Sequence, residues 1–155
     1  MNERENGLQE IAQTNGKILG VDFGDTRTGL AVSDPSRMLA SGIGFISPGG
    51  IEKTADAVAE IAREQRAVAI VVGLPVNMDG SEGARAARCR KFASMLEERL
   101  ALPVAMFDER MTTMTAARYL NETNTRGKKR KGVIDTLSAQ IILQNCMDRL
   151  KYLKG

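Results

Sequence analysis

Asp22 is the most unusual residue of the sequence, because it is a carboxylate inside a segment that otherwise predicts a buried strand. Residues 18–23 are Ile-Leu-Gly-Val-Asp-Phe and alternate with period two, a pattern typical of a strand. The turn-forming residues 24–27 and a second apolar segment at 28–32 predict a hairpin. An acid in such a strand needs a cation, an arginine partner or a set of hydrogen bonds. The pattern equally fits an Asp at the strand end that hydrogen-bonds the following turn.

Two further acids, Glu109 and Asp135, occupy positions from which they can join Asp22. Glu109 follows residues 103–107, a short apolar run that predicts another strand. Asp135 falls in the first turn of a helix expected at 133–152, on the stripe that carries its apolar side chains. A first-turn Asp also interacts favourably with the helix dipole, which is the alternative explanation for this residue.

The sequence contains no histidine, so acid–base or metal chemistry must use carboxylates, lysine, tyrosine or the backbone. Converging carboxylates repel one another unless divalent cations join them, and hard oxygen ligands favour Mg²⁺ or Mn²⁺. Two such cations ~4 Å apart can hold the attacking water and the leaving oxygen of a phosphodiester. We therefore predict that Asp22, Glu109 and Asp135 are both catalytic acids and metal ligands, with Asp22 bridging two metals.

The elements that position these acids begin with strands and then alternate between helix and strand. The pattern predicts three antiparallel strands followed by βαβ crossovers, hence an α/β fold with a mixed five-stranded sheet and helices on both faces. In open sheets of this kind, sites form at the carboxyl ends of the strands. Asp79 and Glu82 are expected to form a capping box at the start of the second helix. The expected strands are 18–23, 28–32, 38–46, 67–73 and 103–107, and the expected helices are 51–65, 79–100, 112–121 and 133–152.

The chain of 155 residues fits one domain with a single substantial core. We assign that domain to residues 17–155 and expect residues 1–16 to be a flexible or partly helical N-terminal extension. The extension has no signal-peptide pattern, and no apolar run approaches the roughly 20 residues that cross a bilayer. Cys89 and Cys146 are isolated within helical apolar patterns, which is typical of buried free thiols. A cytoplasmic protein with no membrane partner is expected.

The net charge of +3 comes mainly from one basic segment, since the rest of the chain is slightly acidic. Such a run favours nucleic-acid binding through counterion release, although it is often only a solvated loop. Arg27 and Arg110 are candidate phosphate contacts and are equally explained by ion pairs with an acid such as Asp108. Asn77 is a candidate substrate contact or a loop hydrogen-bond donor, and Arg85 is interpreted as part of a solvated helix face. The basic residues are Arg126, Lys128, Lys129, Arg130 and Lys131, in a loop expected at 123–132.

Four motifs, in this order, resemble a known family. They are Asp22-Phe-Gly-Asp-Thr-Arg-Thr-Gly-Leu-Ala-Val-Ser-Asp34, Val72-Gly-Leu-Pro-Val-Asn-Met-Asp-Gly80, Phe107-Asp-Glu-Arg-Met-Thr-Thr113 and Asp135-Thr-Leu-Ser-Ala-Gln-Ile-Ile-Leu-Gln144. The resemblance is to the YqgF (RuvX-like) family and covers residues 17–152. It implies an RNase H-like fold, with the presumed catalytic acids at Asp22, Glu109 and Asp135. It also implies a nuclease that matures the 5′ end of pre-16S rRNA or resolves Holliday junctions. Val76 and Met111 stand where the family often has leucine, and neither is one of the acids.

Several functions are compatible with these observations. Processing of precursor rRNA in ribosome biogenesis is the leading hypothesis, with nucleic acid as the partner and a monomer or homodimer as the active form. Resolution of four-way DNA junctions keeps the chemistry and requires a two-fold dimer. A non-catalytic nucleic-acid-binding module keeps only the fold. A phosphotransferase of the actin and sugar-kinase type uses a phosphate loop like the one after Asp22, but that architecture needs two such domains.

Overall fold

Five strands form one mixed sheet in the computed structural model, which describes residues 3–112 and 127–154, with side chains at 5–112 and 133–153. The strands are β1 (Ile18–Asp22), β2 (Thr28–Ser33), β3 (Ala40–Ile46), β4 (Ala69–Leu74) and β5 (Val104–Asp108). Their order across the sheet is β3-β2-β1-β4-β5. The first three are antiparallel neighbours, and β4 and β5 continue parallel to β1. The predicted mixed five-stranded sheet is confirmed.

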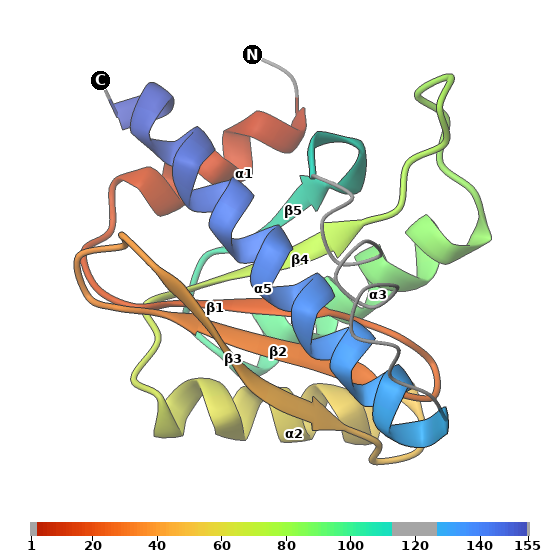
Figure 1. Cartoon of the computed structure of the whole chain (residues 1–155). Helices are drawn as coiled ribbons and strands as arrows, with labels where there is room; N and C mark the ends of the chain where they lie inside the picture. The colour runs from red at the N-terminus through yellow and green to blue at the C-terminus, as the bar shows by residue number, and fades with distance from the viewer. Residues whose placement is uncertain (1–2, 113–126, 155) are drawn as a thin grey trace.

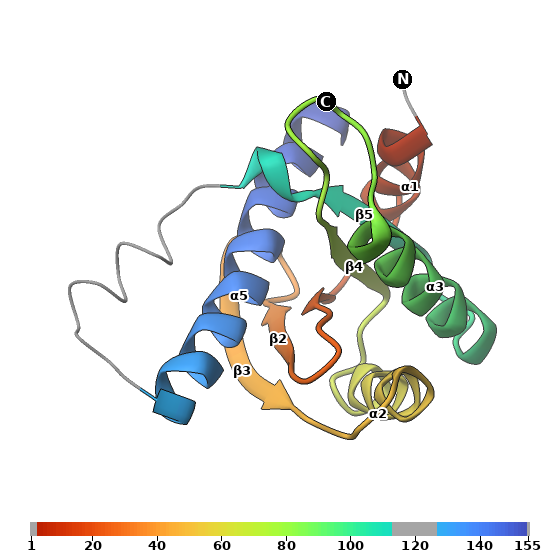
Figure 2. The same ribbon diagram turned by 90° about the vertical axis from the view of Figure 1, so that its right-hand side faces the viewer.

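Helices cover both faces of this sheet, as the two ribbon views show (Figures 1 and 2). On one face lie α2 (Ile51–Glu64) and α3 (Ala84–Arg99), and on the other lie α1 (Glu3–Ala12) and α5 (Gly127–Lys154). A short 3₁₀ helix, η1 (Glu109–Met111), follows β5 directly. Each face has its own apolar cluster, so two cores share one sheet. The prediction of helices on both faces is confirmed.

The period-two alternation of β1 assigns its side chains to the two cores as predicted. Leu19 and Val21 are buried toward α2 and α3, and Phe23 just beyond the strand stacks on Phe92 of α3 with 4.4 Å between ring centroids. Ile18 is buried in the opposite core, under α5. Asp22 has the same parity as Ile18, so its side chain faces α5 rather than the larger apolar cluster.

The N-terminal segment is more than the flexible or partly helical extension that the sequence suggests. The helix α1 spans ten residues and contacts both β5 and α5. Its residues Leu8, Ile11 and Ala12 are fully buried in the second core. This segment therefore completes the apolar core on one face of the sheet. The sequence of residues 1–16 did not indicate this packing, because it is mostly polar.

Two helix starts differ from the predictions. The helix α3 begins at Ala84, and its N-cap residue is Gly83, so no side chain caps the first turn. The predicted capping box at Asp79 is therefore wrong. Glu82 instead accepts a hydrogen bond from Arg90 Nε at 2.6 Å. The last helix begins at Gly127, so residues 127–132 are helical rather than part of a loop. Residues 113–126 lie outside the described part of the chain, and with them most of the helix expected at 112–121.

Both cysteines are buried free thiols, as predicted, and burial raises the pKa of each to about 12. Neither is therefore a reactive thiolate at neutral pH. In the described residues, no helix is both long and apolar enough to span a membrane.

Candidate active site

The register of the sheet places Asp22 between two glycines. Asp22 is the last residue of β1, and its partner on β2 is Gly29. On the other side Val21 pairs with Val72 of β4, so the next residues along, Asp22 and Gly73, are neighbours. Directly opposed residues of adjacent strands point to the same face, so the space above both glycines adjoins the Asp22 side chain.

The space above Gly29 is taken by the backbone of α5. A Cβ added to Gly29 would lie only 1.9 Å from the Asp135 carbonyl oxygen, so no other residue allows this approach. The first part of α5 thus rests directly on β2 beside the residue that pairs with Asp22. This contact brings Asp135 to the end of β1 from more than a hundred residues away in sequence.

The space above Gly73 is shared by Ile142 of α5 and the carboxylate of Glu109. A Cβ added there would lie 3.3 Å from Glu109 Oε1 and 2.6 Å from Ile142 Cδ1 of α5. Glu109 therefore reaches from the start of η1 back over β4, toward Asp22. The three acids singled out in the sequence gather at the carboxyl ends of β1, β4 and β5, where α/β sheets place their sites.

The charges of these acids act on one another. The pKa of Asp22 is raised to about 7, first by burial and then by the negative charges of Glu109 and Asp135. Burial also raises the pKa of Glu109, and the charge of Asp108 adds to the rise. The Arg85 guanidinium opposes both shifts. Asp22 is therefore a carboxylate whose ionised form is poorly compensated by the side chains around it.

The acids do not form a closed cage. Across residues 5–112 and 133–153, no group of three or more His, Cys, Asp or Glu side chains is arranged to hold a metal ion. The Asp135 carboxylate is engaged elsewhere, because its Oδ2 accepts a hydrogen bond from Arg27 Nε at 2.8 Å. Arg27 comes from the turn between β1 and β2, so one cation already partly neutralises the cluster.

The candidate substrate contacts have intramolecular partners. Arg27 forms its ion pair with Asp135 rather than Asp108, whereas Arg110 pairs with Asp108, its Nη2 lying 2.7 Å from Oδ2. The Asn77 side chain donates to Ser81 Oγ at 3.0 Å within its own loop. For all three residues, the intramolecular explanation that the sequence allowed is the one observed.

Arg85 is the residue that the sequence analysis missed. It was assigned to a solvated helix face, yet its charge acts on Asp22, Glu109 and Cys89. The signal was its position four residues before Cys89, which is buried in the core and feels the charges of Glu109 and Asp22. Residues four apart share a helix face, so the exposed Arg85 extends the buried stripe of α3 toward the acids.

The predicted basic contacts fall outside what the structure describes in detail. Arg126 lies among the undescribed residues, and the other four belong to the first turns of α5 with side chains beyond the described set. These four are Lys128, Lys129, Arg130 and Lys131. Their role in nucleic-acid binding stays a prediction.

Known proteins resemble this chain over nearly its whole length. The model of the RuvX family, described as "Holliday junction resolvase", matches residues 16–149. A protein of Ruminiclostridium cellulolyticum named "Putative pre-16S rRNA nuclease" is 38% identical over 135 residues, covering 86% of this chain and 95% of that protein. One of Phenylobacterium zucineum with the same name is 43% identical over 148 residues, covering 94% and 95%.

A solved structure supports the fold independently of sequence. Thermus thermophilus RuvC in complex with a Holliday junction substrate superposes with a TM-score of 0.53 at 13% identity, covering 82% of this chain and 91% of that one. At that identity the similarity shows a shared RNase H-like fold and nothing further. With a family model that spans most of the chain and relatives about 40% identical over almost their full length, the chain belongs to the RuvX family.

Proposed function

We propose that this protein is a divalent-metal-dependent nuclease that hydrolyses phosphodiester bonds with Asp22, Glu109 and Asp135. The observation that supports this most directly is the pair of glycines beside Asp22, which admit Glu109 on one side and α5 with Asp135 on the other. A buried acid next to two further acids is costly unless a dication compensates it. Membership of the RuvX family supports the same chemistry.

The donor set fits a hard divalent cation such as Mg²⁺ or Mn²⁺, because all three groups offer carboxylate oxygens. Such a cation, when bound, supplies Lewis-acid activation of water and stabilises charge at the phosphate. Asp135 would help to hold such a cation, and the Arg27 guanidinium that pairs with Asp135 would then be a candidate contact for a substrate phosphate. Arg85 stands on the α3 side of the acids and is a second candidate phosphate contact.

We propose precursor 16S rRNA as the substrate, because both relatives described above are named "Putative pre-16S rRNA nuclease". The basic residues that begin α5 precede Asp135 on the same helix, so they are suited to contact the RNA backbone beside the acids. Arg110 in η1 and Asn77 in the loop after β4 are further candidate substrate contacts. A role in ribosome biogenesis in the cytoplasm follows from this substrate.

Four-way DNA junctions are the second candidate substrate, because the family model carries the description "Holliday junction resolvase". Symmetric cutting of a junction requires two active sites related by a two-fold axis, hence a homodimer. Processing of a single RNA end is possible for a monomer. Measuring the mass of the protein in solution, with and without junction DNA, distinguishes a monomer from the homodimer that junction cutting requires.

The decisive experiment offers the full-length protein precursor 16S rRNA and a four-way DNA junction side by side. Each substrate is incubated with Mg²⁺, with Mn²⁺ and with a chelator. We expect cleavage of the precursor rRNA only with metal, and a loss of at least roughly 100-fold in Asp22→Asn. Asp25→Asn is the matched control, since it makes the same change three residues on in an exposed position.

Metal binding is measured separately through the thermal stability of the protein. Mg²⁺ or Mn²⁺ should raise the Tm of the wild type and of Asp25→Asn, and should raise that of Asp22→Asn much less. Undiminished cleavage by Asp22→Asn would contradict the assignment of the acids. An absence of both metal binding and cleavage in the wild type would favour a non-catalytic nucleic-acid-binding module.

A further inference from the structure

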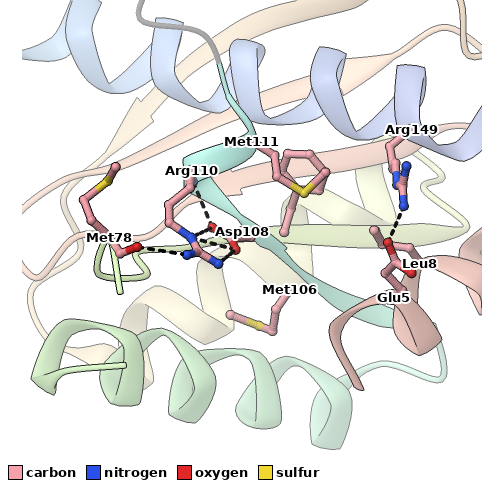
Figure 3. A pocket seen from close by; sticks show the side chains of 9 residues that line it. Glu5, Leu8, Met78, Met106, Asp108, Arg110, Met111 and Arg149 are labelled. Carbon is pink, nitrogen blue, oxygen red and sulfur yellow. Dashed lines mark hydrogen bonds and ion pairs between the residues drawn. The ribbon is translucent and has the colours of Figure 1, made fainter. Parts of the chain in front are cut away.

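A separate pocket of about 330 Å³ lies around the end of β5, the edge strand of the sheet. It is bounded by α1, the loop after β4, the end of β5, η1 and the C-terminal part of α5 (Figure 3). The volume is within the range of small-ligand sites in proteins. None of the roles assigned above to the three acids uses this pocket.

The walls of the pocket are apolar in the middle and polar at two ends. Met78, Met106 and Met111 contribute thioether side chains. Figure 3 shows the Arg110–Asp108 pair at one end and the Arg149–Glu5 pair at the other, with Met106 and Met111 between them. The two pairs cancel in charge, so the pocket suits a neutral ligand with polar edges rather than an anion.

One donor in the pocket lining is left over. Arg149 Nε is buried and has no hydrogen-bond partner in the described part of the chain, although another nitrogen of the same guanidinium pairs with Glu5. A buried donor without an acceptor is unfavourable, so the Arg149 side chain gains if it turns to meet an acceptor that a ligand brings. The pocket thus combines an apolar slot with an arginine whose Nε is buried without an acceptor.

The pocket and the acids lie on either side of one short segment. Asp108 lines the pocket, the next residue Glu109 reaches over Gly73 toward Asp22, and Arg110 again lines the pocket. The pocket lining and one of the three acids are thus consecutive residues of a single segment.

We propose that this pocket binds one unstacked nucleobase of a single-stranded segment next to the phosphate that is cut, a proposal that rests on the nuclease function above. A nucleobase is flat, neutral and apolar on its faces, with donors and acceptors on its edge, which matches the slot and its two polar ends. Thioether side chains are polarizable and adaptable, so we expect little preference among bases. A base-paired nucleotide cannot enter, because its edge and faces are already occupied.

The test uses the full-length Asp22→Asn protein, so that RNA is bound without being cut. Binding of a fluorescently labelled 12-nucleotide single-stranded RNA and of the same RNA in a duplex is measured by anisotropy. Met78→Ala with Met111→Ala removes two wall side chains that are 90% and 48% exposed, so the fold does not depend on them. Met38→Ala with Leu39→Ala is the matched control, because these two are also exposed, at 62% and 64%, and lie outside the pocket.

We expect the pocket variant to bind the single strand roughly ten-fold more weakly, with duplex binding and the control variant unchanged. Unchanged single-strand binding overturns the proposal and leaves the pocket to an apolar side chain of a protein partner. An equal loss for single strand and duplex also overturns it, since base entry would then not be the cause. Because binding is measured without cleavage, this result is independent of whether the wild type cuts RNA.

Discussion

On the face of the sheet under α2 and α3, neighbouring strands present large apolar side chains around the end of β1, whereas at the same place the face under α5 presents glycines and one acid. Val21 and Val72 fill the first face, and on the second Gly29 and Gly73 flank Asp22. Large side chains hold α2 and α3 away from the strands and bury much apolar area. Glycines let α5 lie directly on the backbone and leave room for carboxylates.

The difference separates stability from chemistry within one sheet. The face under α2 and α3 is an ordinary close-packed core, in which every change of volume is felt as a change in unfolding free energy. The face under α5 places two acids beside a third, which costs stability and creates a site with unusual charge. Substitutions under α2 and α3 should therefore change mainly the unfolding free energy, and substitutions beside the acids should change mainly cleavage.

The largest effect on stability is expected for Phe92→Ala, on the face away from the acids. Phe92 is fully buried and stacks on Phe23, so its removal leaves a cavity and should lower the unfolding free energy by about 3–5 kcal/mol. Cleavage per folded molecule should stay near the wild-type value. Urea unfolding and active-site titration measure the two quantities. A loss of cleavage in the folded fraction would contradict the proposal that one face serves stability and the other serves chemistry.

Gly29→Ala should have a smaller effect on stability and a larger one on activity. The new Cβ meets the Asp135 carbonyl at 1.9 Å, so α5 must move away at a cost of about 1–3 kcal/mol. The shift displaces Asp135 from Asp22, and cleavage should fall at least roughly ten-fold. Gly83→Ala is the control, because its Cβ would find only Asn77 Nδ2 at 3.9 Å. Equal cleavage by both variants would contradict the close-approach argument.

Asp22→Asn should stabilise the metal-free protein in a pH-dependent way. The pKa of Asp22 is about 7 in the folded state against an ordinary 3.8. The folded protein therefore binds a proton at Asp22 more tightly than the unfolded protein does. Ionisation therefore destabilises the wild type increasingly as the pH rises from 4 through 7. The variant should gain on the order of 1–3 kcal/mol at pH 8 and nearly nothing at pH 4. Unfolding in chelator at both pH values measures this, and an equal gain at both would point to packing rather than charge.

Arg27→Ala should change stability least, because its ion pair with Asp135 is partly exposed and contributes at most about 1 kcal/mol. Its effect should appear in cleavage, as a several-fold rise in KM if the guanidinium contacts a phosphate. Arg88→Ala is the matched control, since Arg88 pairs with Asp25 in the same turn at a more exposed position. The same KM for both variants would assign Arg27 a structural role only.

Much of the fold could be predicted because periodicity is a local property. The alternation in β1 predicted which side chains face each core, and the apolar run of β4 predicted a strand buried on both sides. The helix starts were less predictable. The helix α3 begins at Ala84 without a side-chain cap, later than the expected start at 79, and α5 begins at Gly127, inside the loop expected at 123–132. The packing of α1 was missed because few of its residues are apolar.

The sequence by itself determined which residues are out of place, because an acid in an apolar strand or on an apolar helix stripe conflicts with its local pattern. Asp22 and Asp135 stand out by that conflict, and Glu109 stands out by its place just after an apolar strand. Only the tertiary structure decided what surrounds them: that Arg27 pairs with Asp135, that Arg85 acts on Asp22, and that a pocket opens beside Asp108. Those relations depend on register and on the distance between sheet and helix, which arise from contacts between segments far apart in the chain.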